Sequence, residues 1–127
     1  MNSLPVWSFD ARREEIKAEI RSILAAVAKE SRTISYSDLV TTMTSHRISR
    51  SDPRLVLLLE EISAEENAKG RGMLSVIVFD DAEHTRLSFF ELAKLLGREI
   101  SNLYDPKARE RVLSSELTRV HAEHRDP

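Results

Sequence analysis

The sequence predicts one mostly helical α+β domain. Its 127 residues are a usual length for a single domain, and no internal repeat or linker divides them. Hydrophobic residues make up 41% of the chain, which is enough for a core, whereas three Gly and four Pro are too few turn residues for a many-stranded β protein. Apolar residues also recur at the three- and four-residue steps of helices. We therefore assign residues 1–127 to one domain.

The first helix is predicted over residues 11–30, after an N-terminal arm of residues 1–9. Asp10 stands where an acceptor side chain caps a helix. Polar residues fill the outer face of this helix, and the inward face carries Ile16, Ile20, Ile23, Leu24 and Val27.

A short strand and a second helix are expected next. Residues 32–34 include two β-branched residues but are long enough for only a stub of strand. Ser35 and Asp38 match the capping box that opens a helix. The second helix is therefore predicted to start there and to run to about Thr44.

The third helix is predicted from Pro53 to about Lys69. The preceding stretch, residues 45–51, is polar and indicates a loop. Asp52 supplies a cap, and Pro53 stands at the first helical position, where its missing N–H is harmless. Gly70 suits the left-handed residue that ends helices.

A β-hairpin is predicted after this helix. Residues 73–79 form an apolar run typical of a strand, residues 80–83 are a turn, and residues 84–87 are a short return strand.

Two further helices complete the predicted domain. A second capping-box pattern, Ser88 to Glu91, opens a short helix that Gly97 ends. Asp105 and Pro106 start the last helix, and residues 123–127 are expected to be frayed. One apolar stripe of the last helix consists of Val112, Leu113, Leu117 and Val120.

The order of helix, strand stub, helix, helix and β-hairpin is that of the winged helix. This fold is a variant of the helix-turn-helix in which the third helix enters a DNA groove and the hairpin is the wing. The sequence thus predicts a winged-helix-like α+β fold, mostly α, with two C-terminal helices.

Several short motifs lie between residues 33 and 122 of this chain. They are Leu59-Glu60-Glu61-Ile62, Glu65-Glu66, Gly70-Arg71-Gly72-Met73-Leu74-Ser75, Phe89-Phe90-Glu91-Leu92-Ala93, Leu96-Gly97-Arg98, Asp105-Pro106 and Ser115-Glu116-Leu117-Thr118-Arg119-Val120. In these motifs the chain resembles a family of small uncharacterised bacterial winged-helix-like proteins. It differs from that family in lacking a Pro-Gly-rich turn before the paired aromatics and an aromatic residue after the Asp-Pro pair. The resemblance implies the fold and leaves the activity open.

Residues 32–39 carry a second resemblance. Their sequence, Arg-Thr-Ile-Ser-Tyr-Ser-Asp-Leu, is similar to the opening of the DNA-binding winged helix in alkyltransferase-like proteins. The Pro-Cys-His-Arg centre of the alkyltransferase is absent, so the resemblance does not extend to repair chemistry.

The local charge predicts double-stranded DNA as the partner. The net charge is −2, yet residues 46–57 carry Arg47, Arg50 and Arg54 against a single aspartate. These arginines stand at the start of the third helix, where a winged helix meets the groove and where cations contact phosphates. Arg71 and Arg86 are expected to add contacts from the hairpin. The alternative is that the three arginines are a solvated loop and helix end.

The acidic residues of the same region favour a different partner. Residues 58–91 carry eight acidic against three basic residues, and acids that face a duplex oppose binding. The third helix and the turn after the strand are therefore an alternative surface for a basic protein, as in an immunity or antitoxin-like inhibitor. The residues of this surface are Glu61, Glu65, Glu66, Asp80 and Asp81.

The last helix has two interpretations. Its apolar stripe either pairs with a second copy, giving a homodimer, or folds back on the first helix and completes the core. The pattern of apolar residues is the same in both cases.

Catalysis and membrane insertion are not expected. The chain has no cysteine, no glycine-rich phosphate loop and no nucleophile-elbow pattern, so we predict no enzyme activity, catalytic residue or cofactor. His121 and His124 stand one helical turn apart, but no third metal ligand is evident, and no metal site is predicted. Apolar runs such as Leu55 to Leu59 are far short of a bilayer span. Without a signal-peptide pattern either, the expected location is the cytoplasm.

Overall fold

The computed structural model describes residues 8–82 and 84–125, and it confirms the mostly helical α+β class. Within this part of the chain, no helix combines the length and the apolar composition needed to cross a bilayer. The elements are η1 (Asp10–Arg12), α1 (Arg13–Lys29), β1 (Ile34–Ser35), α2 (Tyr36–Thr42), α3 (Pro53–Ala68), η2 (Leu74–Ile77), β2 (Val78–Phe79), α4 (Leu87–Leu95) and α5 (Pro106–His124).

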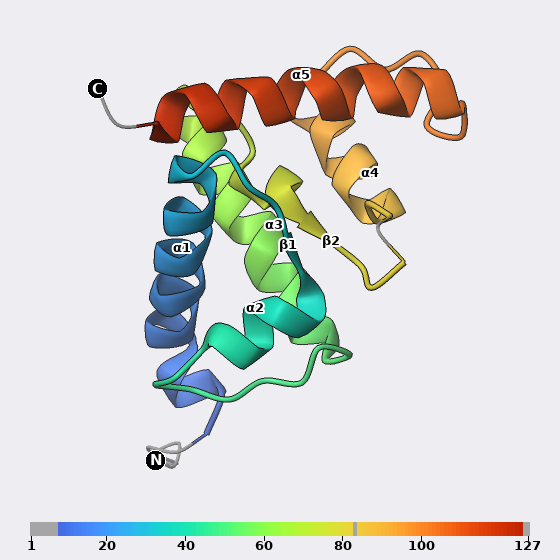
Figure 1. Cartoon of the computed structure of the whole chain (residues 1–127). Helices are drawn as coiled ribbons and strands as arrows, with labels where there is room; N and C mark the ends of the chain where they lie inside the picture. Colours follow the sequence, from blue (N-terminus) through green and yellow to red (C-terminus); the bar gives the residue numbers. More distant parts are fainter. Residues whose placement is uncertain (1–7, 83, 126–127) are drawn as a thin grey trace.

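The helices pack around α3 and the segment that follows it (Figure 1). Helices α1 and α3 lie side by side and run in the same direction. Helix α5 crosses the C-terminal ends of both, while α2 and the loop of residues 43–52 cover the opposite end, where α1 and α3 begin. The N-terminal half of α5 extends over α4. The N-terminal end of α3 and the C-terminal helix thus lie at opposite ends of the molecule.

The core lies between α1, α3 and η2. Fully buried side chains come from each of these elements, because each turns one apolar face inward at helical spacing. Burying such a side chain stabilises the fold by roughly 1.5–3 kcal/mol relative to leaving it exposed. Together with side chains from α2, α5 and the residue before η2, the largest fully buried apolar side chains are Ile20, Leu24, Leu39, Leu55, Leu58, Ile62, Met73, Leu74, Val76, Ile77 and Val120.

Three of the predicted helix starts are confirmed by their caps. The side chain of Ser35 accepts from the N–H of Asp38 at 3.0 Å, and that of Asp52 accepts from the N–H of Arg54 at 2.9 Å. Asp105 caps α5 in the same way. Gly70 ends α3 with a φ of 77°, as expected for a residue that needs the left-handed region.

Two other predicted caps are wrong. Asp10 lies within η1, where Ser8 Oγ accepts from the N–H of Ala11 instead. Ser88 lies inside α4, which begins at Leu87 without a side-chain cap. The capping-box pattern at residues 88–91 therefore misplaced the N-cap by two residues, since Arg86 and not Ser88 holds that position.

The predicted β-hairpin is also a wrong prediction. Residues 74–77 form the 3₁₀ turn η2, and only Val78 and Phe79 form a strand. That strand pairs in parallel with β1, Ile34 opposite Val78, and not with residues 84–87. Among the residues that the structure describes in the segment 80–86, none belongs to a strand, so this part of the chain shows no wing.

The physical reason lies in the backbone hydrogen bonds of residues 73–78. The N–H of Met73 donates to the buried carboxylate of Glu116 at 2.9 Å, and the N–H of Ser75 donates to Ser63 Oγ at 3.0 Å. Side chains of α5 and α3 thus satisfy donors that a hairpin would pair along a ladder. A short apolar run that is buried on all sides has the same composition whether it forms a strand or a helical turn.

Helix α5 folds back on the rest of the chain. Val112 and Val120 are buried, and Leu113 and Leu117 pack against the core. Fraying was expected from residue 123 onward. Instead α5 continues through His124, and Glu123 accepts from the N–H of Gly72 at 2.7 Å. Residues 126–127 of the predicted frayed end, and residues 1–7 of the predicted arm, lie outside the described residues.

Candidate nucleic-acid interface

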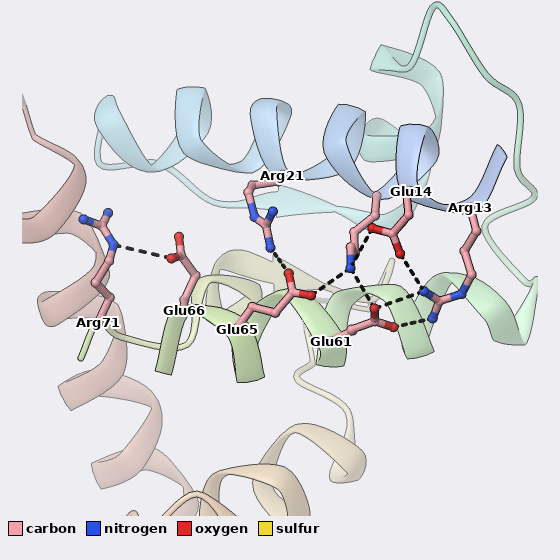
Figure 2. A network of polar contacts seen from close by, with 8 residues as sticks. Arg13, Glu14, Arg21, Glu61, Glu65, Glu66 and Arg71 are labelled. Atoms are coloured by element: carbon pink, nitrogen blue, oxygen red, sulfur yellow. Dashed lines mark hydrogen bonds and ion pairs between the residues drawn. The ribbon is translucent and has the colours of Figure 1, made fainter. Parts of the chain in front are cut away.

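The acidic side of α3 faces α1. Both Nη atoms of Arg13 bond the two carboxylate oxygens of Glu61, one of them at 3.0 Å. Lys17 reaches between two turns of α3 and bonds Glu61 at 2.7 Å and Glu65 at 2.8 Å. Figure 2 shows these carboxylates pointing toward α1, with Arg21 bonding the far oxygen of Glu65.

This series has electrostatic consequences. Hydrogen bonds from Arg13 and Lys17 lower the pKa of Glu61 to about 2, and Lys17 lowers the pKa of Glu65. The same bonds from Glu61 and Glu65 raise the pKa of Lys17, whose side chain is only 7% exposed. All of these groups are therefore ionised at neutral pH, and their charges largely cancel.

The acidic residues predicted to bind a basic protein thus have partners within the chain. Glu61 and Glu65 pair with α1, and the buried Glu66 lies 3.5 Å from Arg71 Nε. Asp80 Oδ1 accepts two N–H groups of its own loop, from Ala82 and His84, both at 2.9 Å. Asp81 accepts from Arg50 and from Ser37. The five acids do not form one open surface.

The loop of residues 43–52 carries two of the predicted DNA contacts, Arg47 and Arg50. The carboxylate of Glu19 attaches this loop to α1. Glu19 Oε2 accepts from the N–H groups of Thr44 at 2.9 Å and Ser45 at 3.0 Å, and its Oε1 lies 3.0 Å from His46 Nδ1. Burial acts to raise the pKa of Glu19, but these hydrogen bonds outweigh it and the pKa is lowered. Glu19 therefore fixes the loop as an ionised carboxylate.

The three arginines of this region have different partners. Arg54 donates to both oxygens of Asp52 and stacks on the Phe9 ring, with its Cζ 4.1 Å from the ring centroid. Arg50 bonds Asp81, which follows β2, at 2.5 Å. Arg47 is exposed and has no hydrogen-bond or ion-pair partner among the residues that the structure describes. Arg47 thus presents all its donors to solvent.

A cavity of about 570 Å³ opens between the start of α1 and this loop. Arg47 and Arg54 line it, together with residues that the sequence did not single out. No Asp or Glu is among its described lining residues, which are Ser8, Phe9, Arg12, Ile16, Ser45, His46, Arg47 and Arg54.

The remaining predicted DNA contacts lie elsewhere. Arg71 follows the C-terminal end of α3, where its Nη2 lies 3.0 Å from His124 Nε2. The guanidinium of Arg86 lies over the ring of Tyr36, 4.9 Å from the centroid. The structure therefore brings Arg47 and Arg54 together in one cavity, leaves Arg50 on the same loop, and separates Arg71 and Arg86 from them.

The histidine pair of the last helix is occupied by other contacts. His121 Nε2 lies 3.0 Å from the carbonyl oxygen of Arg32, and His124 contacts Arg71. Within residues 8–82 and 84–125, no three His, Asp or Glu side chains are grouped as a metal site requires.

Sequence reasoning missed three contributors to this region: Glu19, Arg12 and His46. Glu19 and Arg12 belong to the first helix and lie about 30 positions before the loop, so no local spacing connects them to it. His46 adjoins Arg47, but the sequence pattern assigns it no role. In comparisons with known proteins, no family model, no curated protein and no solved structure matches this chain.

Proposed function

We propose that this protein is a non-enzymatic binder of double-stranded DNA that uses the start of α3 and the loop before it. In this proposal the fold is winged-helix-like, α2 and α3 are its helix-turn-helix pair, and the segment of residues 80–86 stands in place of the wing. The family resemblance described above is part of the same proposal.

This proposal rests on which charged residues of α3 and of the loop before it have partners within the chain. Acids on the second half of the helix oppose DNA binding only if they face the duplex. Glu61 and Glu65 instead face α1 and are neutralised there. At the solvent-facing start, Arg50 and Arg54 pair with Asp81 and Asp52 but stay exposed, and Arg47 has no described partner. The objection that the sequence raised against DNA binding is thereby weakened.

The test is a salt-dependent titration of the protein against mixed-sequence duplex DNA. We expect affinity to fall steeply with salt, because cations that contact phosphates release counterions. The triple variant Arg47→Ala/Arg50→Ala/Arg54→Ala should weaken binding and flatten the slope of log K against log[salt] by up to about 2.7, or about 0.9 for each lost contact.

A matched control removes the same charge from the opposite end of the molecule. Lys94→Ala/Lys107→Ala/Arg111→Ala deletes three exposed cations of α4 and α5 whose side chains have no described partner. This control should bind DNA nearly as the wild type does. Equal losses in the two variants, or no binding at low salt, would overturn the proposal.

A further inference from the structure

We propose that the 570 Å³ cavity at the start of α1 is a binding site for a phosphate group. The ligand is a phosphate with its sugar, supplied either by a DNA backbone or by a free nucleotide. Only the DNA source rests on the proposed function, because a cavity that binds phosphate does not require that the protein bind a duplex.

The donors of the cavity suit a phosphate. An arginine carries five N–H donors in a planar fork that matches phosphate oxygens. Arg54 uses Nε and Nη2 in hydrogen bonds to Asp52, which leaves the donors of Nη1 for a ligand. Arg47 donates to none of the described residues. The hydroxyl groups of Ser8 and Ser45 add polar groups to the lining, whereas both ring nitrogens of His46 already face carboxylates, those of Glu19 and Glu15.

Arg54, one of the arginines of the cavity, is held in place before any ligand arrives. The Arg54 guanidinium is fixed on one side by the Phe9 ring and on the other by both oxygens of Asp52. A fixed cation loses less conformational freedom on binding than a mobile one. The partly exposed ring of Phe9 supplies an apolar surface on which the sugar of a nucleotide can pack.

The loop side of the cavity is fixed by Glu19. Because this carboxylate holds the N–H groups of Thr44 and Ser45 and the His46 ring, it sets where Ser45, His46 and Arg47 face the cavity. The size is also suitable, since small-molecule sites span roughly 300–1,000 Å³.

Several carboxylates lie near the cavity and offset part of its positive charge. Glu15 bonds Arg12 at 2.9 Å and lies 3.4 Å from His46 Nε2, while Glu19 and Asp52 bond their own partners. These acids reduce the positive field, so a ligand needs more than one acceptor oxygen on the free donors to bind. The oxygens of a phosphate group meet that condition, and a halide does not.

The experiment is a titration with inorganic phosphate, followed by NMR through the amide signals of residues 44–48. We expect saturable shifts confined to this loop and to the start of α1. Arg47→Ala should weaken binding about tenfold, the usual effect of losing a charge-assisted hydrogen bond. Since Arg47 has no described partner, this variant should fold as the wild type does, and Arg111→Ala is its matched control.

A second arm identifies the source of the phosphate. It compares a dinucleotide that has only its internal phosphodiester with the same dinucleotide carrying a 5′-phosphate. Equal affinity supports a DNA backbone as the ligand, and stronger binding of the 5′-phosphorylated form supports a free nucleotide.

The outcomes separate this inference from the proposed function. Saturable phosphate binding without duplex binding keeps the site and removes the DNA proposal. Duplex binding that depends on Arg50 but not on Arg47, with phosphate shifts that never saturate, overturns the site and leaves the DNA proposal standing.

Discussion

The ion pair of Arg98 with Glu116 is buried, whereas the series of pairs between α1 and α3 is half exposed. Only 4% of Glu116 is exposed, and it receives Arg98 Nε at 2.7 Å and the N–H of Met73 at 2.9 Å. Glu61 belongs to the half-exposed series, and 33% of its side chain is exposed. The two networks use the same chemistry in different surroundings.

The surroundings decide what each network contributes. Arg98 joins three elements, because it also bonds Asn67 at the end of α3 and the carbonyl oxygen of Leu96. Removing one partner of a buried pair leaves an uncompensated charge in the interior, which is costly. In the half-exposed series water replaces a lost partner. The buried pair therefore fixes where α5 sits, and the half-exposed series neutralises the acids of α3.

The largest predicted effect is that of Glu116→Ala. This change leaves the Arg98 guanidinium and the Met73 N–H without their acceptor, so we expect a loss of about 3 kcal/mol in the free energy of unfolding. Urea unfolding followed by circular dichroism measures it. The control is Glu110→Ala, an exposed glutamate of the same helix, which should change stability by less than about 0.5 kcal/mol. Similar losses in the two variants would mean that the pair does not hold α5.

Lys17→Met should have a smaller effect. Methionine keeps the buried aliphatic stem and removes the ammonium group, while Glu61 retains Arg13 and Glu65 retains Arg21. We expect a loss of about 1 kcal/mol in the same unfolding measurement. Lys94→Met, on the exposed face of α4, provides the control. A loss as large as that of Glu116→Ala would remove the distinction between the two networks.

Local signals in the sequence predicted the helices well. A cap acts within four residues, so Ser35, Asp52 and Asp105 marked helix starts that the structure confirms. The hairpin prediction failed because the partners of Met73 and Ser75 are side chains distant in sequence.

The spacing of the charged residues in α1 and α3 predicts a contact between the two helices. Arg13, Lys17 and Arg21 recur at four-residue steps, as do Glu61 and Glu65, so each set forms one stripe on its helix. Two complementary stripes on neighbouring helices predict mutual pairing. For the candidate site, the sequence singled out Arg47 and Arg54, which line one cavity, but the role of Glu19 depends on how α1 packs against the loop of residues 43–52.

The smallest predicted effect is the pH dependence that Glu61 contributes. Its pKa is lowered from 4.5 to about 2 in the folded protein, so its stabilising pairs are fully present above pH 4.5 and are lost as pH falls toward 2. Because a third of the side chain is exposed, solvent screening reduces the contribution to about 0.5 kcal/mol. Other carboxylates titrate in the same range, so the quantity to measure is the difference in unfolding free energy between the wild type and Glu61→Gln at each pH. That difference should be largest near pH 5 and shrink toward pH 2. A difference that stays constant over this range would show that the Glu61 charge adds nothing to the hydrogen bonds that glutamine also makes.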